Sequence, residues 1–200
     1  MLRKPVLLLL IFAAITVALM ILAPRFLLYS SAYEKADAIV LFLGPDFSLR
    51  QKQAYKLISE NNADYLIIPA YKKTLKINKG NIKSLSRDFS LGNVNKKNSS
   101  TFNRPRYYED THLEVLEART VMADKGLKSA IFVSSPYHMR RISYIVRKVF
   151  SDEKASFYFV PTDFEKAPAD FWELSLADWR KVGREYGKII WFFIYASWAD

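Results

Sequence analysis

The stretch SAIFVSSPYHMRRISYIVRKVF, at Ser129–Phe150, decides the fold of this 200-residue chain. Its first part, Ser129–Val133, is a short apolar run of the kind that forms a buried parallel strand. Apolar residues then recur at helical spacing: Met139, Ile142, Ile145, Val146, Val149 and Phe150. This spacing predicts an amphipathic helix that packs one face against a sheet. A strand followed at once by such a helix is the repeating unit of an α/β fold.

The same alternation extends in both directions along the chain. Three further apolar runs predict strands: Asp37–Leu43, Asp64–Ala70 and Ser156–Val160. Further helices are expected from about Ser48, from Asp110 or Thr111 to a C-cap at Gly126, and from about Pro168 onwards. We therefore expect an α/β domain with a three-layer, mostly parallel, Rossmann-like sheet and helices on both of its faces. Ligands of such a sheet bind at the carboxyl ends of its strands.

A continuous apolar segment precedes this domain. Pro5–Ala23 contains 19 residues, of which only Thr16 has a polar side chain. As a helix it spans roughly 28 Å, which matches the hydrocarbon core of a bilayer. We expect residues 1–29 to form a transmembrane signal anchor and residues 35–200 to form the α/β domain.

The charges around the apolar segment predict its orientation. Arg3 and Lys4 are expected to stay in the cytoplasm, which places everything after Tyr29 outside it. The chain is then a single-pass protein of the cytoplasmic (inner) membrane with an extracytoplasmic C-terminal domain. The alternative is a signal peptide cleaved after Ser30-Ser31-Ala32. An uncleaved anchor is favoured, because the apolar run is longer than usual for a signal peptide and Arg25 interrupts the approach to the cleavage site.

The positive charge of the chain is concentrated in one segment. The net charge is +10, and residues 71–106 hold ten basic residues against a single acid, Asp88. We interpret this segment as a basic insertion in the domain. It is either a solvated connection or an electrostatic contact to anionic lipid headgroups or a cell-wall polymer. Nucleic acid is not expected as a partner, because the anchor places the segment outside the cytoplasm.

The run AIFVSSPYHMRR, at Ala130–Arg141, carries a resemblance to a known family. It follows a Thr-x-x-Glu helix start at Thr111–Glu114, and an Arg-Glu-Tyr occurs near the C-terminus at Arg184–Tyr186. From about Lys35 to Val160 the chain resembles the YdcF/SanA/ElyC-like family. The resemblance implies a membrane-anchored protein that takes part in cell-envelope or cell-wall maintenance.

Two turns depart from the pattern of that family. Gly44 is followed by Pro45-Asp46 where the family has a Gly-rich turn, and Pro69-Ala70 stands where the family tends to have Ser-Gly. Glycines let backbone amides approach a ligand closely, so a divergent or degenerate anion pocket is one of the alternatives.

The strand-to-helix junction holds the candidate catalytic residue. Ser134 and Ser135 are candidates for binding a phosphate, and a nucleophilic serine beside His138 is the less favoured hypothesis. His138 is the candidate general acid or base, with a structural histidine as the alternative. Tyr137 is a candidate for stacking on a ligand or hydrogen bonding to it, or else for packing at the sheet edge.

Arginines are the expected clamps for an anionic ligand. Arg140 and Arg141 point about 100° apart on a helix, so one is expected to face the cleft and the other solvent or an acid. Arg50 is a second candidate clamp, although a surface charge is the alternative.

Four other residues complete the candidate ligand site: Gly44, Asp46, Thr111 and Glu114. Thr111 and Glu114 have the spacing of a capping box, which is the alternative reading of both. Asp46 is alternatively the cap of the next helix.

No metal site is predicted. The chain has no cysteine and only two histidines, and these do not have a ligand-like spacing. A cluster of Glu109, Asp110 and His112 was the remaining candidate for a metal. The sequence names no cofactor.

These observations lead to one favoured function and two alternatives. The favoured function is an envelope protein with a cleft for an anionic small molecule or a lipid-linked phosphate. The alternatives are a hydrolase or transferase acting on a phosphorylated substrate, and a non-catalytic binding or scaffold protein with a degenerate pocket. The apolar run Ile189–Ala199 is expected to be a packed terminal helix, with membrane-interface contact through Trp191 and Trp198 as the alternative.

Overall fold

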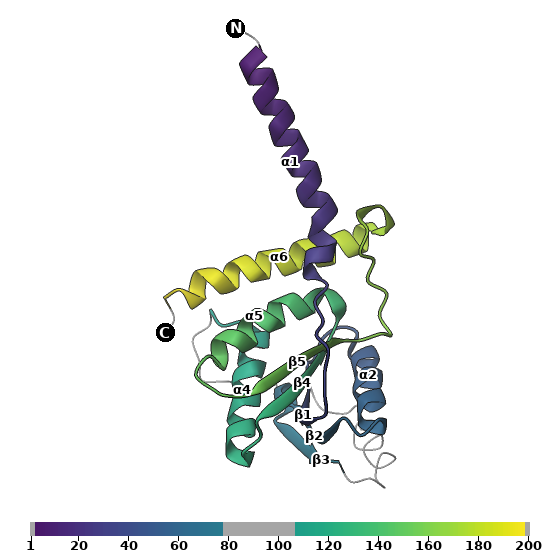
Figure 1. Cartoon of the computed structure of the whole chain (residues 1–200), viewed down its shortest axis with the longest axis vertical. Coiled ribbons are helices and arrows are strands. Elements are labelled where there is room, and N and C mark those ends of the chain that lie inside the picture. The colour runs from purple at the N-terminus through teal and green to yellow at the C-terminus, as the bar shows by residue number, and fades with distance from the viewer. Residues whose placement is uncertain (1–2, 78–106, 199–200) are drawn as a thin grey trace.

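Five strands form one mostly parallel sheet in the part of the chain that the computed structural model describes, residues 3–77 and 107–198 (Figure 1). The strands are β1 Ala36–Leu41, β2 Ala63–Ile68, β3 Lys73–Lys76, β4 Ser129–Ser134 and β5 Ser156–Pro161. Their order is β3-β2-β1-β4-β5, and only β3 runs antiparallel to its neighbour. The expectation of an α/β domain with a mostly parallel sheet is confirmed.

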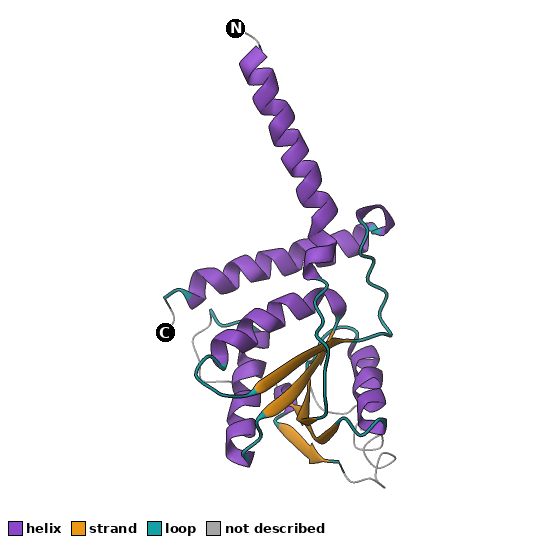
Figure 2. Ribbon diagram, viewed as in Figure 1, coloured by secondary structure: helices purple, strands orange, loops and turns teal. Residues whose placement is uncertain are grey.

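Helices connect the strands and flank the sheet, which is orange in Figure 2. The α-helices are α1 Arg3–Leu27, α2 Phe47–Ser59, α4 Asp110–Lys125, α5 Met139–Val149 and α6 Leu176–Ala196. Short 3₁₀ turns are η1 Pro69–Tyr71, η3 Pro136–His138 and η4 Phe171–Glu173.

Alternate residues of the central strand β1 enter two different hydrophobic clusters. Val40 packs in a cluster that includes Ile142 of α5, whereas Ile39 packs in a cluster that includes Leu57 of α2. All four side chains are fully buried. Because both faces of the strand are covered, its sequence is continuously apolar rather than alternating.

Local signals explain two of the helix ends. Gly126 is the C-cap of α4 in the left-handed conformation, as expected, with φ of 66°. α6 begins with a capping box in which Ser175 and Asp178 each bond to the backbone of the other.

The segment after β2 differs from expectation. β2 ends at Ile68, because Pro69 cannot donate a ladder hydrogen bond and instead begins η1. Lys72 then adopts a left-handed conformation, with φ of 50°, and the chain turns back as β3. This edge strand was expected to be part of the basic insertion. The remainder of that insertion, residues 78–106, lies outside the described residues.

Helix α1 extends away from the domain, and its Val6–Leu27 portion is long and apolar enough to cross a membrane (Figure 1). Leu8 and Phe12 are 67% and 71% exposed, respectively, so none of the described residues of the domain covers the N-terminal half of α1. Only the last turn of α1 packs into the protein, and Leu27 there is fully buried.

Several contacts join the base of α1 to the domain. Tyr186 of α6 donates a hydrogen bond to the carbonyl of Ala23 at 3.0 Å, and its ring stacks on Phe26 at 5.9 Å. Arg25 forms an ion pair with Asp170. In both cartoon views α6 lies across the base of α1 (Figures 1 and 2).

Replacing Asp37 by Ala is expected to lower the free energy of unfolding by about 1–3 kcal/mol. The Asp37 carboxylate accepts hydrogen bonds from the amides of Lys128 and Ser129, at 2.7 and 2.9 Å, and so joins the starts of β1 and β4. Asp64→Ala is the matched control, because Asp64 also lies at a strand start but forms only an exposed ion pair with Lys35. Urea unfolding in detergent measures both variants, and equal effects would contradict the role of Asp37.

Candidate functional site

Arg50 of α2 reaches the carboxyl edge of the sheet. Its Nε donates to the hydroxyl of Ser135 at 3.0 Å, just after β4. Its Nη1 donates to the carbonyl of Phe42 at 3.3 Å and to the carbonyl of Leu43, just after β1. The guanidinium therefore bridges the ends of the two central strands, which is where an α/β sheet places its ligands.

Gly44 is required for this approach. A Cβ at position 44 would lie 2.3 Å from Nη2 of Arg50. Any other residue would push the guanidinium away, so Gly44 serves a close approach of a side chain rather than a special backbone angle.

Arg50 is buried without a charged partner. It is 5% exposed, yet no carboxylate of the described residues lies within ion-pair distance of it. Burial lowers the pKa of the Arg50 guanidinium, and the nearby charges of Glu165 and Glu114 act in the opposite direction. A buried cation is normally paired with an anion, so the guanidinium of Arg50 is available to bind an anionic ligand.

Glu114 of α4 lies near Arg50 but does not neutralise it at neutral pH. Burial raises the pKa of Glu114 to about 8, against the charge of Arg50 and a hydrogen bond with the backbone of Leu43. The carboxyl group is therefore mostly protonated at pH 7, and the positive charge of Arg50 persists.

Ser134 adds an unsatisfied hydroxyl at the same edge. It is fully buried at the end of β4, and its Oγ has no hydrogen-bond partner among the described residues. A buried hydroxyl without a partner costs free energy, so a ligand oxygen here would be stabilised.

A second group of polar side chains surrounds Arg141 of α5. Its Nε donates to Glu185 at 2.8 Å, and its Nη1 donates to Glu109 and, at 3.2 Å, to Thr111. Its Nη2 lies 2.8 Å from Nδ1 of His138. Arg141 is fully buried and doubly paired with carboxylates, so its charge is compensated within the protein.

His138 stands between Arg141 and Thr111. Its Nδ1 lies 3.1 Å from Glu185, and its Nε2 lies 3.3 Å from the hydroxyl of Thr111. Burial, together with the charge of Arg141, lowers the pKa of His138 to about 4, so the ring is neutral at pH 7. In one tautomer the proton is on Nδ1, which donates to Glu185 and leaves Nε2 free to accept a proton. In the other tautomer the proton is on Nε2, and Nδ1 accepts a hydrogen bond from Arg141.

The carboxylates of this group differ in their titration. Burial acts to raise the pKa of Glu185, but the hydrogen bond from His138 and the charge of Arg141 prevail and hold it well below its usual range. Burial raises the pKa of Glu109, and Arg141 opposes that shift. Glu185 is therefore the firm negative partner of Arg141.

The structure thus brings most of the predicted residues to one edge of the sheet. They form two adjacent groups there: Gly44, Arg50, Glu114, Ser134 and Ser135 in one, and Thr111, His138 and Arg141 in the other. The alternative reading of Thr111 and Glu114 as a capping box is wrong. The N-cap of α4 is Glu109, without a side-chain cap bond, and Thr111 bonds to Arg141 instead.

Three predicted residues lie outside these groups. Arg140 donates to the carbonyl of Phe26 at 2.8 Å and lies over the Phe26 ring, so it belongs to the base of α1. The Tyr137 hydroxyl donates to the carbonyl of Pro168 at 2.6 Å, which is a structural link. Asp46 is the N-cap residue of α2 but forms no cap bond, and it lies 3.8 Å from Lys181.

Two acids of this region were not among the predicted site residues. Glu185 lies 44 residues beyond Arg141, and the signal for it was the Arg-Glu-Tyr at Arg184–Tyr186. The side chain of Glu165 is 8% exposed, pairs with Lys181 at 3.0 Å and keeps one oxygen without a partner among the described residues. No sequence signal pointed to Glu165.

A metal site is not formed in the described part of the chain, where no group of three potential ligands occurs. The cluster of Glu109, Asp110 and His112 does not assemble. Glu109 pairs with Arg141, whereas His112 lies 3.0 Å from the Tyr195 hydroxyl within an aromatic cluster.

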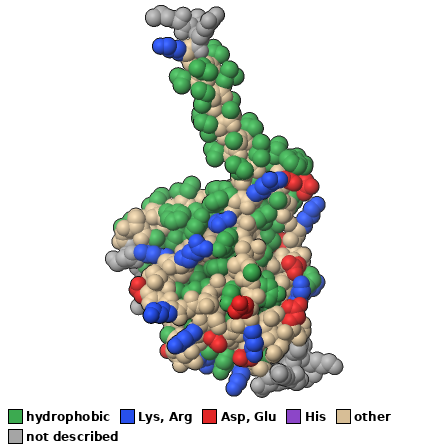
Figure 3. Space-filling view, viewed as in Figure 1, with side chains coloured by type: hydrophobic (Ala, Val, Ile, Leu, Met, Phe, Trp, Pro, Cys, Tyr) green, Lys and Arg blue, Asp and Glu red, His purple; other side chains and the backbone are tan. Residues whose placement is uncertain are grey.

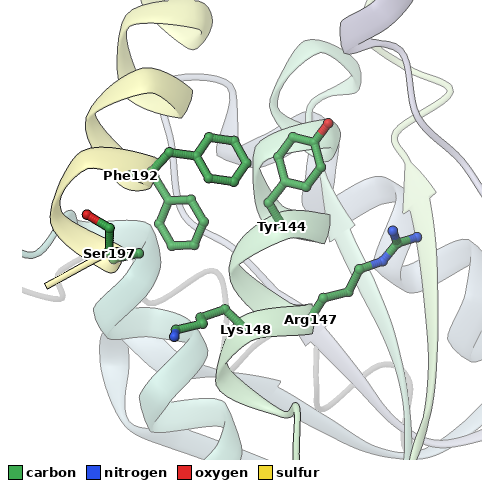
Figure 4. A pocket seen from close by; sticks show the side chains of 7 residues that line it. Tyr144, Arg147, Lys148, Phe192 and Ser197 are labelled. Atoms are coloured by element: carbon green, nitrogen blue, oxygen red, sulfur yellow. The ribbon is translucent and has the colours of Figure 1, made fainter. Parts of the chain in front are cut away.

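A separate pocket of about 260 Å³ lies between α5 and α6 (Figure 4). Phe192, Phe193 and Tyr144 give it apolar walls, and Arg147 and Lys148 lie on its α5 side. None of its lining residues belongs to the two polar groups at the sheet edge.

Comparison of the chain with protein-family models, with curated proteins and with solved structures finds no match.

Replacing Glu185 by Ala is expected to lower the free energy of unfolding by about 3–5 kcal/mol, because it leaves part of the charge of buried Arg141 uncompensated. Arg184→Ala is the control, since Arg184 is exposed on the same helix. Both variants are measured by urea unfolding in detergent. If Glu185→Ala were as stable as Arg184→Ala, Glu185 would not be the principal partner of Arg141.

Proposed function

We propose that the protein is a membrane-anchored protein of the cell envelope whose α/β domain binds an anionic, phosphorylated ligand. The domain is a three-layer, Rossmann-like arrangement, and the ligand occupies the carboxyl edge of the sheet. Its role is in cell-envelope or cell-wall maintenance, in keeping with the resemblance to the YdcF/SanA/ElyC-like family.

The observation that carries this proposal is the buried, unpaired guanidinium of Arg50. Two arginines lie at this edge, and among the described residues carboxylates form ion pairs with Arg141 but not with Arg50. Of the two acids whose charges act most strongly on Arg50, Glu165 pairs with Lys181, and Glu114 is mostly protonated at neutral pH. A phosphate oxygen beside Arg50 would compensate the charge through charge-assisted hydrogen bonds.

The neighbouring groups suit the same ligand. The unpartnered hydroxyl of Ser134 supplies a donor, and the hydroxyl of Ser135 already bonds to Arg50. A free phosphate and a lipid-linked phosphate share this chemistry, and the anchor favours the second.

The anchor itself is proposed to remain on the mature protein, with its N-terminus in the cytoplasm. Leu27 is buried with Tyr137 and Val182, and Ser31 bonds to both backbone groups of Phe159. Cleavage after Ala32 would remove these contacts from the domain. The basic residues of 71–106 are proposed to contact anionic headgroups or a cell-wall polymer.

A hydrolase or transferase acting on a phosphorylated substrate is the second candidate function. The arrangement that favours it is a neutral imidazole held by a carboxylate, with His138 between Glu185 and the Thr111 hydroxyl. With the proton on Nδ1, Nε2 accepts a proton from a hydroxyl or from water. His138 is then the catalytic residue and Glu185 its positioning residue.

Inorganic phosphate tests the ligand site. Phosphate at about ten times its Kd is expected to stabilise the full-length protein in detergent by about 1.4 kcal/mol, which raises Tm by about 3–6 °C. Chloride at the same ionic strength is the reference. Arg50→Gln is expected to lose this phosphate-dependent rise, whereas Lys52→Gln, an exposed position on the same helix, keeps it. A rise that persists in Arg50→Gln would place the anion elsewhere, and no rise in the wild type would favour a non-catalytic scaffold.

Phosphate binding is expected to weaken as pH rises through about 8. Over this range Glu114 loses its proton. The resulting carboxylate offsets the positive charge of the Arg50 guanidinium and repels the phosphate anion. Glu114→Gln removes this dependence, and it also controls for the ionisation of phosphate itself. Without phosphate, stability falls from about pH 4.5 to 8, because folded Glu114 holds a proton that the unfolded chain has lost. Calorimetric titrations from pH 6 to about 9 measure the binding, and identical profiles for the two proteins would contradict the role of Glu114.

A further inference from the structure

Helix α6 is apolar on the side that faces away from the domain. Ile190, Trp191, Ile194 and Trp198, at and just beyond its C-terminal half, are between 42% and 58% exposed. On one edge of this side, Trp191 donates a hydrogen bond to the carbonyl of Tyr107 and the ring of Trp198 packs on the ring of Tyr107. The opposite side of the helix is buried in the domain through Val182, Ile189, Phe192 and Tyr195. A helix end that is apolar all round is normally covered on every side, but the described residues leave most of the outer side of α6 exposed.

The position of this face relative to α1 indicates what covers it. α6 lies across the base of α1 and is joined to it through Tyr186 and Ala23 (Figure 1). Figure 3 shows hydrophobic side chains along α1 and again on the adjoining surface of the domain. A bilayer crossed by α1 would therefore meet the outer side of α6.

Exposed apolar side chains also lie on the other side of the base of α1. η4 packs beside α1, where Arg25 pairs with Asp170. Trp172 of η4 is 66% exposed, and Leu176 at the start of α6 is 79% exposed. Exposed tryptophans thus lie on both sides of the helix that enters the membrane. Tryptophan concentrates at the boundary between hydrocarbon and headgroups.

Cations accompany the apolar residues. Arg180, Arg184 and Lys188 recur every four residues along α6, and all three are exposed. Their long apolar stems can lie along an apolar surface while the charged ends reach anionic headgroups.

We propose that these residues form a membrane-docking surface, the α6 platform, which rests in the interfacial region of an anionic bilayer. The α6 platform consists of Trp172, Leu176, Ile190, Trp191, Ile194 and Trp198. The proposal rests on the membrane anchor of the proposed function and goes beyond it, because the domain then lies against the bilayer instead of hanging from α1. Since α6 also carries Glu185, docking holds the polar groups at the sheet edge near the membrane, within reach of a lipid-linked phosphate.

Tryptophan fluorescence in lipid vesicles tests this docking. The chain has four tryptophans, Trp172, Trp179, Trp191 and Trp198, and none of them lies in α1. Quenching therefore reports on the domain and not on the anchor. The full-length protein is reconstituted in vesicles of phosphatidylcholine and phosphatidylglycerol, with or without phosphatidylcholine brominated near the carbonyl end of its chains.

The wild type is expected to be strongly quenched by the brominated lipid. Ile190→Glu/Ile194→Glu is expected to lose most of this quenching, because two carboxylates on the α6 platform disfavour contact with the bilayer. Thr120→Glu/Ala123→Glu adds the same charge to exposed positions of α4 and is expected to be quenched like the wild type.

Two outcomes would overturn the proposal in distinguishable ways. If the wild type is not quenched but resists carbonate extraction, the docking proposal is overturned and the anchor is retained. If light scattering then shows a dimer, the α6 platform is covered by a second copy of the chain. Release by carbonate would overturn the anchor together with the docking. The phosphate-dependent rise in Tm is measured in detergent, so it reports on the ligand site independently of either result.

Discussion

The buried guanidinium of Arg141 is the constraint on which the rest of the site depends. A fully buried cation costs several kcal/mol unless carboxylates and hydrogen bonds compensate it. Glu185 comes from α6 and Glu109 immediately precedes α4, whereas Arg141 belongs to α5. The requirement to pair one charge therefore holds three helices together at the carboxyl edge of the sheet. It also sets the position of His138, which contacts both Arg141 and Glu185.

The two buried arginines at this edge differ in their partners, and this difference indicates that Arg141 has a structural role and Arg50 a ligand-binding role. Arg141 has two carboxylate partners, so its charge is compensated by ion pairs that join helices. Arg50 is almost as buried, but its hydrogen bonds within the described part of the chain go to a hydroxyl and two carbonyl oxygens. Its acidic neighbour Glu114 is mostly protonated at neutral pH for the same reason, which is burial. Among the described residues, Arg50 has no ion-pair partner and the buried hydroxyl of Ser134, at the end of the same central strand β4, has no hydrogen-bond partner, which is the arrangement expected of an anion site.

Helix α6 connects this site with the base of α1. Glu185 reaches into the polar group from one side of the helix, while Tyr186, the next residue, holds the base of α1. Toward the C-terminus the outer side of the same helix is apolar and exposed. One continuous helix thus links the candidate site, the apolar helix α1 and the proposed α6 platform. A shift of α6 would therefore move Glu185 and change its contacts with His138 and Arg141.

Three features could be predicted from local sequence patterns: the alternation of strands and helices, the apolar N-terminal helix and the strand-to-helix junction of the candidate site. These features follow from local patterns: continuous apolar runs such as Asp37–Leu43 and the helical spacing after Met139. Only the tertiary structure decided that Arg141 is buried in the site while Arg140 contacts the base of α1, since consecutive helical residues point about 100° apart. Glu185 becomes a partner of Arg141 only when α6 packs against α5, and no local pattern encodes a contact across 44 residues. The same holds for Arg50, because whether a charge is compensated depends on every element that folds around it.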